Sequence, residues 1–280
     1  MKGFIKVIIA GAVILALGIA IVGIALGVNN WQIDGDYEIK YYECVEDNTT
    51  LDIEFSVGTL EINYYDSEKI KIEYPEDKDL SATISENNGT LSFSTTNKRA
   101  WFNFGWFKKT PPTRIWIPQG DIMNLDLEMN AGTVKIADGE YGDFDVDMNA
   151  GTFSIGDIIC KKLSIEMNAG TMNLKNVTSE QNVELDLNAG TMNIQSLVCP
   201  SFVATVSAGT ANINRLQASS TGIDVSAGTV KLGMVGAKSD YYITVDKSAG
   251  SCNISNQTGA KDLYIKADIS AGNLNVKFGV

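Results

Sequence analysis

The sequence predicts an all-β fold, a single-stranded parallel β-helix (β-solenoid) that follows one N-terminal transmembrane helix. Three observations lead to this prediction: a recurring tetrapeptide, its fixed period and the alternation of apolar residues around it. The tetrapeptide is Asn-Ala-Gly-Thr, with Ser in place of Asn in the later copies. Its eight glycines are spaced 19, 19, 20, 19, 19, 22 and 22 residues apart, at Gly132, Gly151, Gly170, Gly190, Gly209, Gly228, Gly250 and Gly272. A period near 20 residues is typical of stacked repeats, here coils of 19–22 residues.

Apolar residues alternate with polar ones on both sides of each glycine. In the second copy the apolar positions are Phe144, Val146, Met148, Phe153 and Ile155. Strict alternation is typical of strands with one buried face. Each coil is therefore expected to contain a strand, a tight corner at Ala-Gly, a second strand and a shorter third wall. The inward residues of this third wall are expected to be Ile158, Val177, Leu197, Leu216 and Val235.

Stacking of like residues favours the parallel solenoid, assigned to residues 125–280, over an antiparallel meander folded into a sandwich. Parallel crossovers are right-handed by default, so right-handed coiling is favoured. In this arrangement the first residues of the motif form a ladder of amide side chains, which hydroxyl side chains continue. The expected ladder consists of Asn130, Asn149, Asn168, Asn188, Ser207, Ser226, Ser248 and Ser270.

Residues 29–124 are predicted to form a β-rich region that leads into the coils and caps the first one. Short alternating runs are separated by polar turns, among them Asn87-Asn88-Gly89. A degenerate motif, Ser56-Val57-Gly58-Thr59, lies in this region. At the other end the chain finishes with Phe278-Gly279-Val280 and no obvious cap, so self-association through a C-terminal edge is expected there. Lys247 falls on an inward phase and indicates a one-residue bulge.

Residues 7–28 are uncharged and mostly apolar, and a membrane-spanning helix needs about 20 such residues. Lys2 and Lys6 precede this segment, so residues 1–6 are expected to be a short cytoplasmic end, with the C-terminal domain outside. The alternative is a cleaved signal peptide, but no convincing small-x-small cleavage site precedes Trp31. The expected location is therefore the cell membrane, crossed by a single-pass anchor.

Composition excludes several classes of function. The chain has 22 Lys+Arg against 34 Asp+Glu, which argues against nucleic acid as a partner. It has no histidine, so Ser-His and Cys-His dyads are excluded and the commonest metal ligand is missing. No cofactor is expected. The cysteines are expected to be structural and unpaired, since Cys160 and Cys199 lie two coils apart, roughly 9.6 Å by strand spacing, while a disulfide needs Cα atoms within about 7 Å.

An aromatic loop is the first candidate site. It contains Trp101, Phe102, Phe104, Trp106, Phe107, Lys108 and Lys109. Amphipathic aromatic residues and lysines are typical of membrane interfaces, so one interpretation is contact with lipid headgroups or with a partner. The other interpretation is that the rings fold back and cover the end of the solenoid.

An acidic stripe is the second candidate site. It consists of Glu128, Asp147, Glu166 and Asp186, each four residues before a motif glycine. Stacking places these like charges on neighbouring strands, which is destabilising. One interpretation is a weak site for divalent cations such as calcium, which prefers oxygen ligands. The other is a solvated face that keeps the protein soluble.

Three features together resemble a known family: the alternating segment from Leu51 to Ile62, the Ile115-Trp116-Ile117-Pro118 segment and the Ala-Gly-Thr coils. Over roughly residues 45–280 the chain resembles the adhesin domain of unknown function found in bacterial cell-envelope proteins, including LiaG-like membrane proteins. The resemblance implies an envelope location, a binding or structural role and a link to envelope stress. It transfers no catalytic residues.

The expected function is therefore that of a membrane-anchored, extracytoplasmic, non-catalytic binding or scaffold protein, whose partner is an envelope polymer or protein of unknown identity. The alternative is a carbohydrate-active β-helix enzyme, because parallel β-helices also host polysaccharide lyases and hydrolases. Such enzymes use paired carboxylates, or a carboxylate-bound cation with Lys or Arg. Outward Lys and Arg are sparse in the coils, and no long loop is available to wall a cleft.

Overall fold

The computed structural model describes residues 33–34, 36–98 and 108–280, in two compact units. The first unit comprises residues 1–36 and 99–110; its described strands, β1 (Ile33–Asp34) and β7 (Lys108–Lys109), pair in parallel. The second unit comprises residues 37–98 and 111–280 and holds the other strands that the structure describes. The predicted transmembrane segment, residues 7–28, lies outside the described residues. Among the residues that are described, no helix is long and apolar enough to cross a bilayer.

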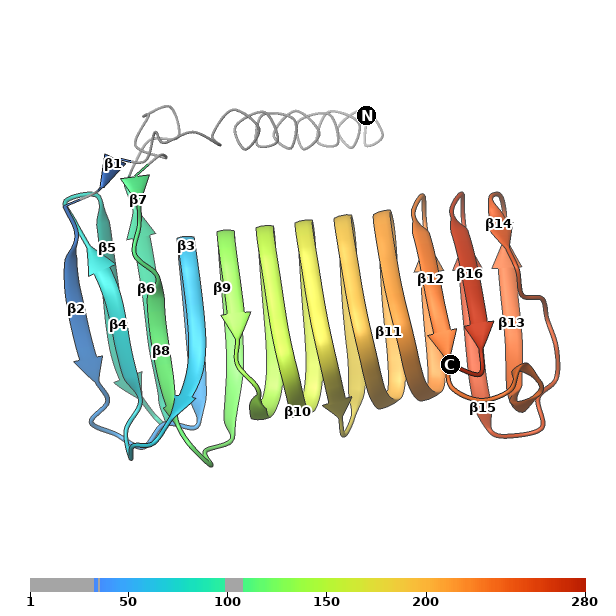
Figure 1. Ribbon diagram of the computed structural model, residues 1–280, viewed down its shortest axis with the longest axis horizontal. Helices are drawn as coiled ribbons and strands as arrows, with labels where there is room; N and C mark the ends of the chain where they lie inside the picture. The colour runs from blue at the N-terminus through green and yellow to red at the C-terminus, as the bar shows by residue number, and fades with distance from the viewer. Residues whose placement is uncertain (1–32, 35, 99–107) are drawn as a thin grey trace. The chain divides into compact units, whose positions relative to one another are not determined.

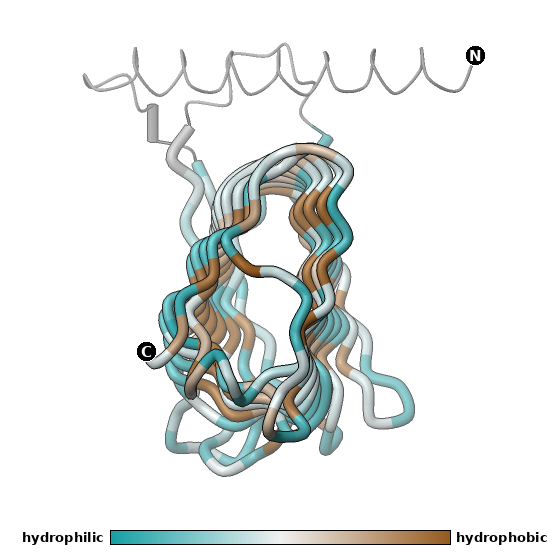
Figure 2. The backbone as a smooth tube through the Cα atoms, turned by 90° about the vertical axis from the view of Figure 1, so that its right-hand side faces the viewer, coloured by the Kyte–Doolittle hydropathy of each residue, from teal (hydrophilic) through white to brown (hydrophobic). Residues whose placement is uncertain are grey.

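The second unit is a stack of parallel coils, which confirms the predicted all-β repeat fold (Figure 1). Its central strands are β9 (Met123–Ile136), β10 (Gly139–Ser179), β11 (Asn182–Val225) and β12 (Thr229–Met234). β10 and β11 are long because each passes through successive coils without a break. Motif residues stack on motif residues, with Gly132 beside Gly151 and Gly170 beside Gly190. Seen along the stack in Figure 2, the coils superimpose.

We name three walls in each coil by position relative to the motif glycine. The first wall precedes the glycine, the second wall follows it, and the third wall returns the chain to the next coil. The predicted inward residues are buried in all three walls apart from Val235 and the Gly250 coil, where Val245 is half-buried and Lys247 is exposed. Val235 is half-buried because the register shifts in its coil, so that Met234 instead pairs with Leu216. The core is thus a continuous apolar column enclosed by the walls.

The Ala-Gly corner requires glycine for two reasons. Gly151 has φ +131°, a backbone conformation that side chains strongly disfavour. A Cβ built on Gly151 would also overlap the carbonyl oxygen of Gly132 in the coil below. Beside the corner, the predicted amide ladder is present, because Asn149 donates to Asn130 at 3.2 Å and Asn168 donates to Asn149 at 3.1 Å. Asn188 extends it by donating to Asn168 at 2.8 Å.

The capping region begins with a true coil. In β3 (Thr50–Tyr65) the degenerate motif stacks on the first full copy, with Gly58 beside Gly132. On the first wall β6 pairs with β3 in parallel and β5 follows antiparallel to β6. On the second wall β8 pairs with β3 in parallel, and β4 and β2 follow in antiparallel pairings. Their bounds are β2 (Glu38–Glu43), β4 (Lys71–Glu76), β5 (Leu80–Asn87), β6 (Thr90–Asn97) and β8 (Thr113–Pro118). The predicted turn joins β5 to β6, with positive φ at Asn88 and Gly89.

At the other end, the last two coils stack in reversed order. The strands are β13 (Tyr241–Lys247), β14 (Ser251–Cys252), β15 (Leu263–Ile269) and β16 (Asn273–Phe278). β15 pairs with β11 on one side and with β13 on the other, and β16 lies between β12 and β14. The Gly272 coil is therefore inserted between the Gly228 and Gly250 coils, although it comes last in the chain (Figure 1).

This order bears on two predictions. β16 is flanked by β12 along its length and by β14 at Asn273 and Leu274, so Phe278-Gly279-Val280 does not lie at the end of the stack, and self-association through it stays a prediction. Instead, the Gly250 coil ends the stack, and the segment after β14 covers its first wall: Ile243 and Gln257 exchange two backbone hydrogen bonds of 3.0 Å, and Asn256 accepts one from the Val245 amide at 2.6 Å. Such contacts occupy groups that an edge strand leaves open. The expected bulge at Lys247 is absent, because β13 stays in register with β15.

Candidate functional site

The outer face of the first wall carries two rows of acidic side chains. The row four positions before the glycines contains, in stacking order, Glu54, Glu128, Asp147, Glu166, Asp186, Asp224, Asp268 and Asp246, with Thr205 the neutral member. The row six positions before them contains Asp52, Asp126, Asp145 and Glu184. The four predicted stripe residues are all exposed members of the first row. Carboxylates thus lie directly opposite one another on neighbouring strands.

The electrostatic cost of these rows is clearest at Asp126. Partial burial raises its pKa, and the neighbouring carboxylates of Asp52 and Asp145 raise the pKa further. Hydroxyl groups on β6 stabilise two of these carboxylates: Ser92 donates a hydrogen bond to Asp52 at 3.0 Å, and Ser94 donates one to Glu54 at 3.2 Å. The rows are therefore a real source of repulsion that the fold only partly compensates.

The geometry of the rows bears on the predicted cation site. Metal ions need several ligands that converge on one point. Each acidic row instead extends along the stack, and in the described part of the chain no group of three His, Cys, Asp or Glu side chains could hold a metal ion. The interpretation of Glu128, Asp147, Glu166 and Asp186 as ligands stays a prediction, and it would require diffuse binding along the row.

The outer face of the second wall has a different composition. Its first row is threonine in most coils, and its central row contains Asn173, Asn193 and Asn212, then Lys231 and Asn275. The asparagines form a second amide ladder, because Asn193 donates to Asn173 at 3.1 Å and Asn212 donates to Asn193 at 3.0 Å. This ladder was not predicted, although the spacing of the asparagines in the sequence would have indicated it.

In the coils nearest the capping region, lysines on the second wall form ion pairs with carboxylates. Lys135 lies 3.2 Å from Glu61, which also accepts from Arg114 at 3.3 Å. Further along, Lys175 lies 3.1 Å from Asp157. These pairs are half-exposed, so each contributes little to stability, but they neutralise the local charge.

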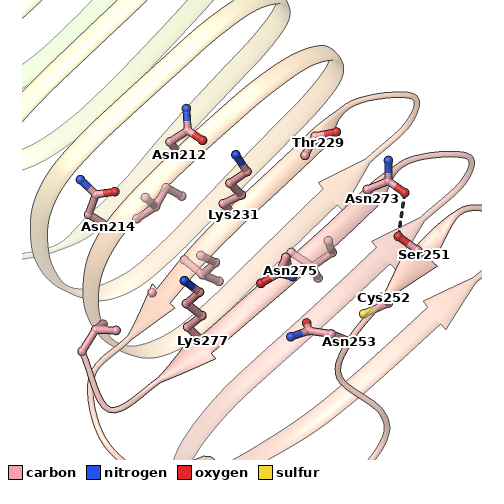
Figure 3. A pocket seen from close by; sticks show the side chains of 15 residues that line it. Asn212, Asn214, Thr229, Lys231, Ser251, Cys252, Asn253, Asn273, Asn275 and Lys277 are labelled. Carbon is pink, nitrogen blue, oxygen red and sulfur yellow. Dashed lines mark hydrogen bonds between the residues drawn. The ribbon is translucent and has the colours of Figure 1, made fainter.

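A groove of about 820 Å³ lies on the second wall where the coil order is reversed (Figure 3). We name it the lysine groove. Its polar side chains include Asn212, Asn214, Lys231, Ser251, Asn275 and Lys277. Lys231 comes from β12 and Lys277 from the neighbouring β16, and Gly233 lies directly beside Lys277. At the outer side of the groove, the Asn253 side chain exchanges two 2.8 Å hydrogen bonds with the backbone of Val276 in β16.

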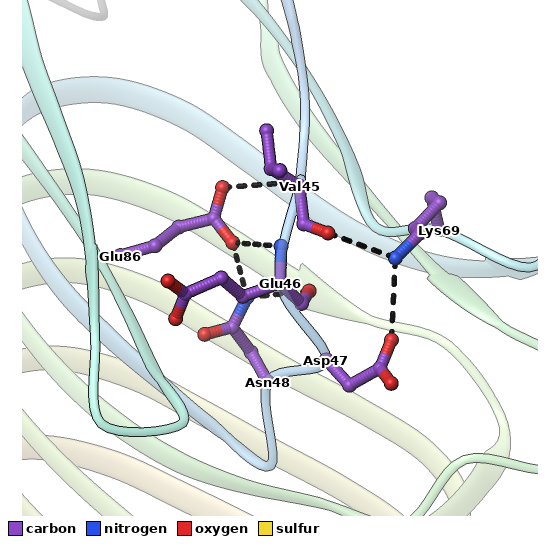
Figure 4. Close-up of polar contacts among 6 residues, drawn as sticks. All are labelled: Val45, Glu46, Asp47, Asn48, Lys69 and Glu86. Carbon is purple, nitrogen blue, oxygen red and sulfur yellow. Dashed lines mark hydrogen bonds and ion pairs between the residues drawn. The ribbon is translucent and has the colours of Figure 1, made fainter.

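A carboxylate clasp in the capping region was also missed by the sequence analysis (Figure 4). Glu86 accepts hydrogen bonds from the Tyr42 hydroxyl at 2.6 Å, the amides of Val45 and Glu46 at 2.9 and 2.8 Å, and the Asn48 side chain at 2.8 Å. Desolvation alone would raise the pKa of Glu86, but these donors outweigh it and lower the pKa to about 2. The clasp ties the loop after β2 to the β5–β6 hairpin.

The cysteines are free, as predicted. Cys44, Cys160 and Cys199 are buried, and Cys252 is half-buried beside the lysine groove. Burial raises the pKa of Cys160 to about 11 and that of Cys199 to about 12. The thiolate is the reactive form, so these two thiols are poor nucleophiles at neutral pH.

The aromatic loop falls largely outside the described residues. Trp101, Phe102, Phe104, Trp106 and Phe107 are not described, and Lys108 and Lys109 are described only as the backbone of β7. Their interpretation as a membrane or partner contact therefore stays a prediction.

Comparisons with known proteins identify structural relatives and a family for this fold. Two solved structures, each 16% identical to this chain, cover 88% of it and are themselves covered completely. One, from Bacteroides fragilis, is described as a "putative adhesin" and gives a TM-score of 0.53; the other, from Parabacteroides distasonis, is described as a "putative lipid binding protein" and gives 0.51. At this identity the likeness establishes the fold alone. A comparison with curated protein sequences found no match. The model of the Toastrack DUF4097 family matches residues 48–278, which include the coil stack and most of its cap, and the chain belongs to this family.

Proposed function

We propose that this protein is a membrane-anchored, extracytoplasmic, non-catalytic binding or scaffold protein of the bacterial cell envelope. The observation that carries the proposal is the pair of long outer faces, on which similar side chains recur from coil to coil, acidic on the first wall and mostly Thr and Asn on the second. Repeated faces of this kind suit extended binding surfaces. The descriptions of the two structural relatives, an adhesin and a lipid-binding protein, are compatible with a surface-binding role.

Membrane anchoring is inferred from the sequence. Residues 7–28 are long and apolar enough to span a bilayer, and Lys2 and Lys6 favour a cytoplasmic N-terminus. The same reasoning places residues 31–280 outside the cytoplasm. The resemblance to envelope proteins further suggests a link to envelope stress.

A non-catalytic role is favoured by the arrangement of the carboxylates. Glycosidases hold two carboxyl groups on opposite sides of one bond, about 5–9.5 Å apart. Here the acidic side chains lie side by side along one exposed face, as Glu128 and Asp147 do. The lysine groove on the second wall is lined by no Asp or Glu side chain. A carbohydrate-active enzyme is therefore the weaker candidate.

Topology can be tested with a single-cysteine variant. In a Cys252→Ser background the other native cysteines are buried, so Thr244→Cys supplies an exposed thiol. A membrane-impermeant maleimide should label it in intact cells. A matched Gly3→Cys variant should be labelled only after permeabilisation. Labelling of Gly3→Cys but not of Thr244→Cys in intact cells would contradict the proposed orientation.

The aromatic loop supplies a second contact in this proposal, directed at lipid headgroups or at a partner. Replacing Trp101, Phe104 and Trp106 with Ser should weaken binding to vesicles or envelope fractions, because these rings suit interfaces. The thermal midpoint should stay nearly unchanged. A large loss of stability with unchanged binding would instead support the alternative, in which the rings cover the end of the solenoid.

A further inference from the structure

We propose that the lysine groove binds an anionic, hydroxyl-rich polymer, in which sugar or polyol units carry phosphate or carboxylate groups. This inference names a ligand class for the binding role proposed above and rests on that role. The groove's charge, its free amides and its position in the stack all support this ligand class.

The groove is a cationic site on an acidic protein. The chain has a formal net charge of −12, yet the groove is lined by two lysines and by no Asp or Glu. Lys135 and Lys175 on the same wall are paired with carboxylates. Within the described part of the chain, no carboxylate lies within 4.0 Å of the ammonium group of Lys231 or Lys277. Their charge is uncompensated and attracts a negative group.

Charge is also segregated between the walls. The carboxylate rows occupy the outer face of the first wall, whereas the groove lies on the outer face of the second wall. These faces point away from each other, and exposed charges separated by more than about 8–10 Å are largely screened at physiological salt. An anionic ligand can therefore approach the groove without meeting the acidic rows.

The amides around the lysines suit a ligand that carries hydroxyl groups. The side chains of Asn214 and Asn275 are exposed and make no hydrogen bond to another described residue. Each amide offers two donor hydrogens and one acceptor oxygen, so it can both donate to and accept from a hydroxyl. Ser251 is already engaged, because it donates to Asn273 at 2.7 Å.

The reversed coil order creates the site. Lys231 lies beside Asn275, and Lys277 lies beside Gly233, so the two lysines are diagonal neighbours on adjacent strands. Diagonal neighbours are roughly 7–8 Å apart at the backbone, within reach of one or two charged groups of a linear polymer. Gly233 adds no side chain between them, and the Val280 side chain packs over it, with Cγ2 3.0 Å from the position that a Cβ on Gly233 would take. If the coils stacked in chain order, Lys277 would lie two coils away from Lys231.

A polymer fits this site better than a membrane surface does. Attraction to anionic lipids is typical of clusters of four to eight Lys or Arg. The groove offers two lysines among amide and hydroxyl side chains. Its volume is within the range of about 300–1,000 Å³ that is usual for small-molecule sites, so it would hold a short segment of a chain.

The test uses the full-length protein in neutral detergent micelles and measures binding by calorimetry. The probes are poly(glycerol phosphate), which carries phosphate, polygalacturonate, which carries carboxylate, and neutral dextran. The groove variant is Lys231→Gln with Lys277→Gln. The matched control is Lys78→Gln with Lys247→Gln, which removes the same charge from two exposed lysines outside the groove. Thermal midpoints of both variants check the fold.

We expect the native protein to bind at least one anionic polymer, with dextran much weaker. The groove variant should bind about tenfold more weakly because two charge-assisted contacts are lost, and the control should bind like the native protein. Preference between the two anionic probes then identifies phosphate or carboxylate as the recognised group.

Several results would overturn the inference. These are no binding of either anionic polymer, equal binding of dextran, or an equal loss in the control variant. Binding to phosphatidylglycerol vesicles that depends on Lys231 and Lys277, without polymer binding, would assign the groove to a membrane instead. All of these outcomes leave the topology test unaffected, so failure here and failure of the proposed function are distinguishable.

Discussion

The first and second walls belong to the same coils and share one interior, yet their outer faces have opposite character. Inside, both walls present continuous rows of apolar side chains. Outside, the first wall carries rows of carboxylates that are only partly compensated, while the second carries Thr, Asn and Lys, with Glu61 neutralised by Arg114 and Lys135. Packing dictates the interior of a solenoid, but it leaves the exterior free. The contrast is the reason why we assign the proposed recognition to the outer faces and not to the core.

The largest expected effect comes from breaking the corner that joins the two walls. Gly151→Ala should destabilise the protein by about 3 kcal/mol, because a methyl group combines backbone strain at φ +131° with overlap of the Gly132 carbonyl. The thermal midpoint should fall by roughly 10 °C. Gly222→Ala is the matched control, since a Cβ there meets only ordinary contacts, the nearest at 3.6 Å. Equal midpoints for the two variants would refute this account of the corner.

A smaller effect is expected from opening the carboxylate clasp. Glu86→Gln should destabilise the protein by about 1 kcal/mol, after allowance for solvent screening, because charge-assisted hydrogen bonds to the loop after β2 are weakened. Since the pKa of Glu86 is lowered to about 2 from 4.5, its contribution is present above pH 4.5 and is lost as the pH falls towards 2. Chemical denaturation at pH 7 and pH 3 measures both effects. Exposed Glu68→Gln serves as the control and should change neither.

The first wall should respond to pH with the opposite sign. Burial and the carboxylates of Asp52 and Asp145 raise the pKa of Asp126, so its ionised form opposes folding. This penalty is present above the raised pKa and is relieved as the pH falls towards the ordinary value of 3.8. Asp126→Asn should therefore stabilise the protein at pH 7 by roughly 0.5 kcal/mol.

The converse variant completes this test. Ser164 occupies the same row as Asp126 and lies beside Glu184, so Ser164→Asp should destabilise the protein by a similar amount. Both changes should shrink at high salt, where exposed charges are screened. If the two variants shift the thermal midpoint in the same direction, repulsion along the row is not the cause.

The comparison also separates what the sequence could predict from what it could not. The period and the alternation predict the inward rows, the glycine corner and the Asn130 ladder, because each depends on one coil meeting another of its kind. The order in which the Gly250 and Gly272 coils stack could not be predicted in this way, because like residues meet in either order. Tyr242 and Tyr264 stack with ring centroids 5.4 Å apart, and chain order would also have made them neighbours.

The lysine groove and the clasp depend on contacts that carry no periodic signal. Lys277 lies on the strand next to that of Lys231 only because β16 is inserted beside β12. Glu86 finds its donors across 38–44 residues of chain. Neither pairing repeats from coil to coil, so neither could be inferred from spacing.

The smallest expected effect is that of calcium on the acidic row. A dedicated extracellular site binds calcium with a Kd of about 10⁻⁴–10⁻³ M, which at 2 mM calcium would stabilise the protein by roughly 0.6–1.8 kcal/mol. The carboxylates of Glu128, Asp147, Glu166 and Asp186 extend along the stack and do not converge, so a Kd near 10 mM and a gain of about 0.1 kcal/mol are expected. The thermal midpoint should then rise by less than about 1 °C relative to sodium chloride at the same ionic strength.

The variant that checks this expectation is Glu128→Gln with Asp147→Asn. It removes two directly opposed charges and should raise the midpoint equally with and without calcium, because the gain comes from relieved repulsion. A midpoint that rises several degrees with calcium in the native protein, and not in this variant, would identify the row as a cation site. In that case the contrast between the walls would be one of ligands, with cations bound on the first wall and anions on the second.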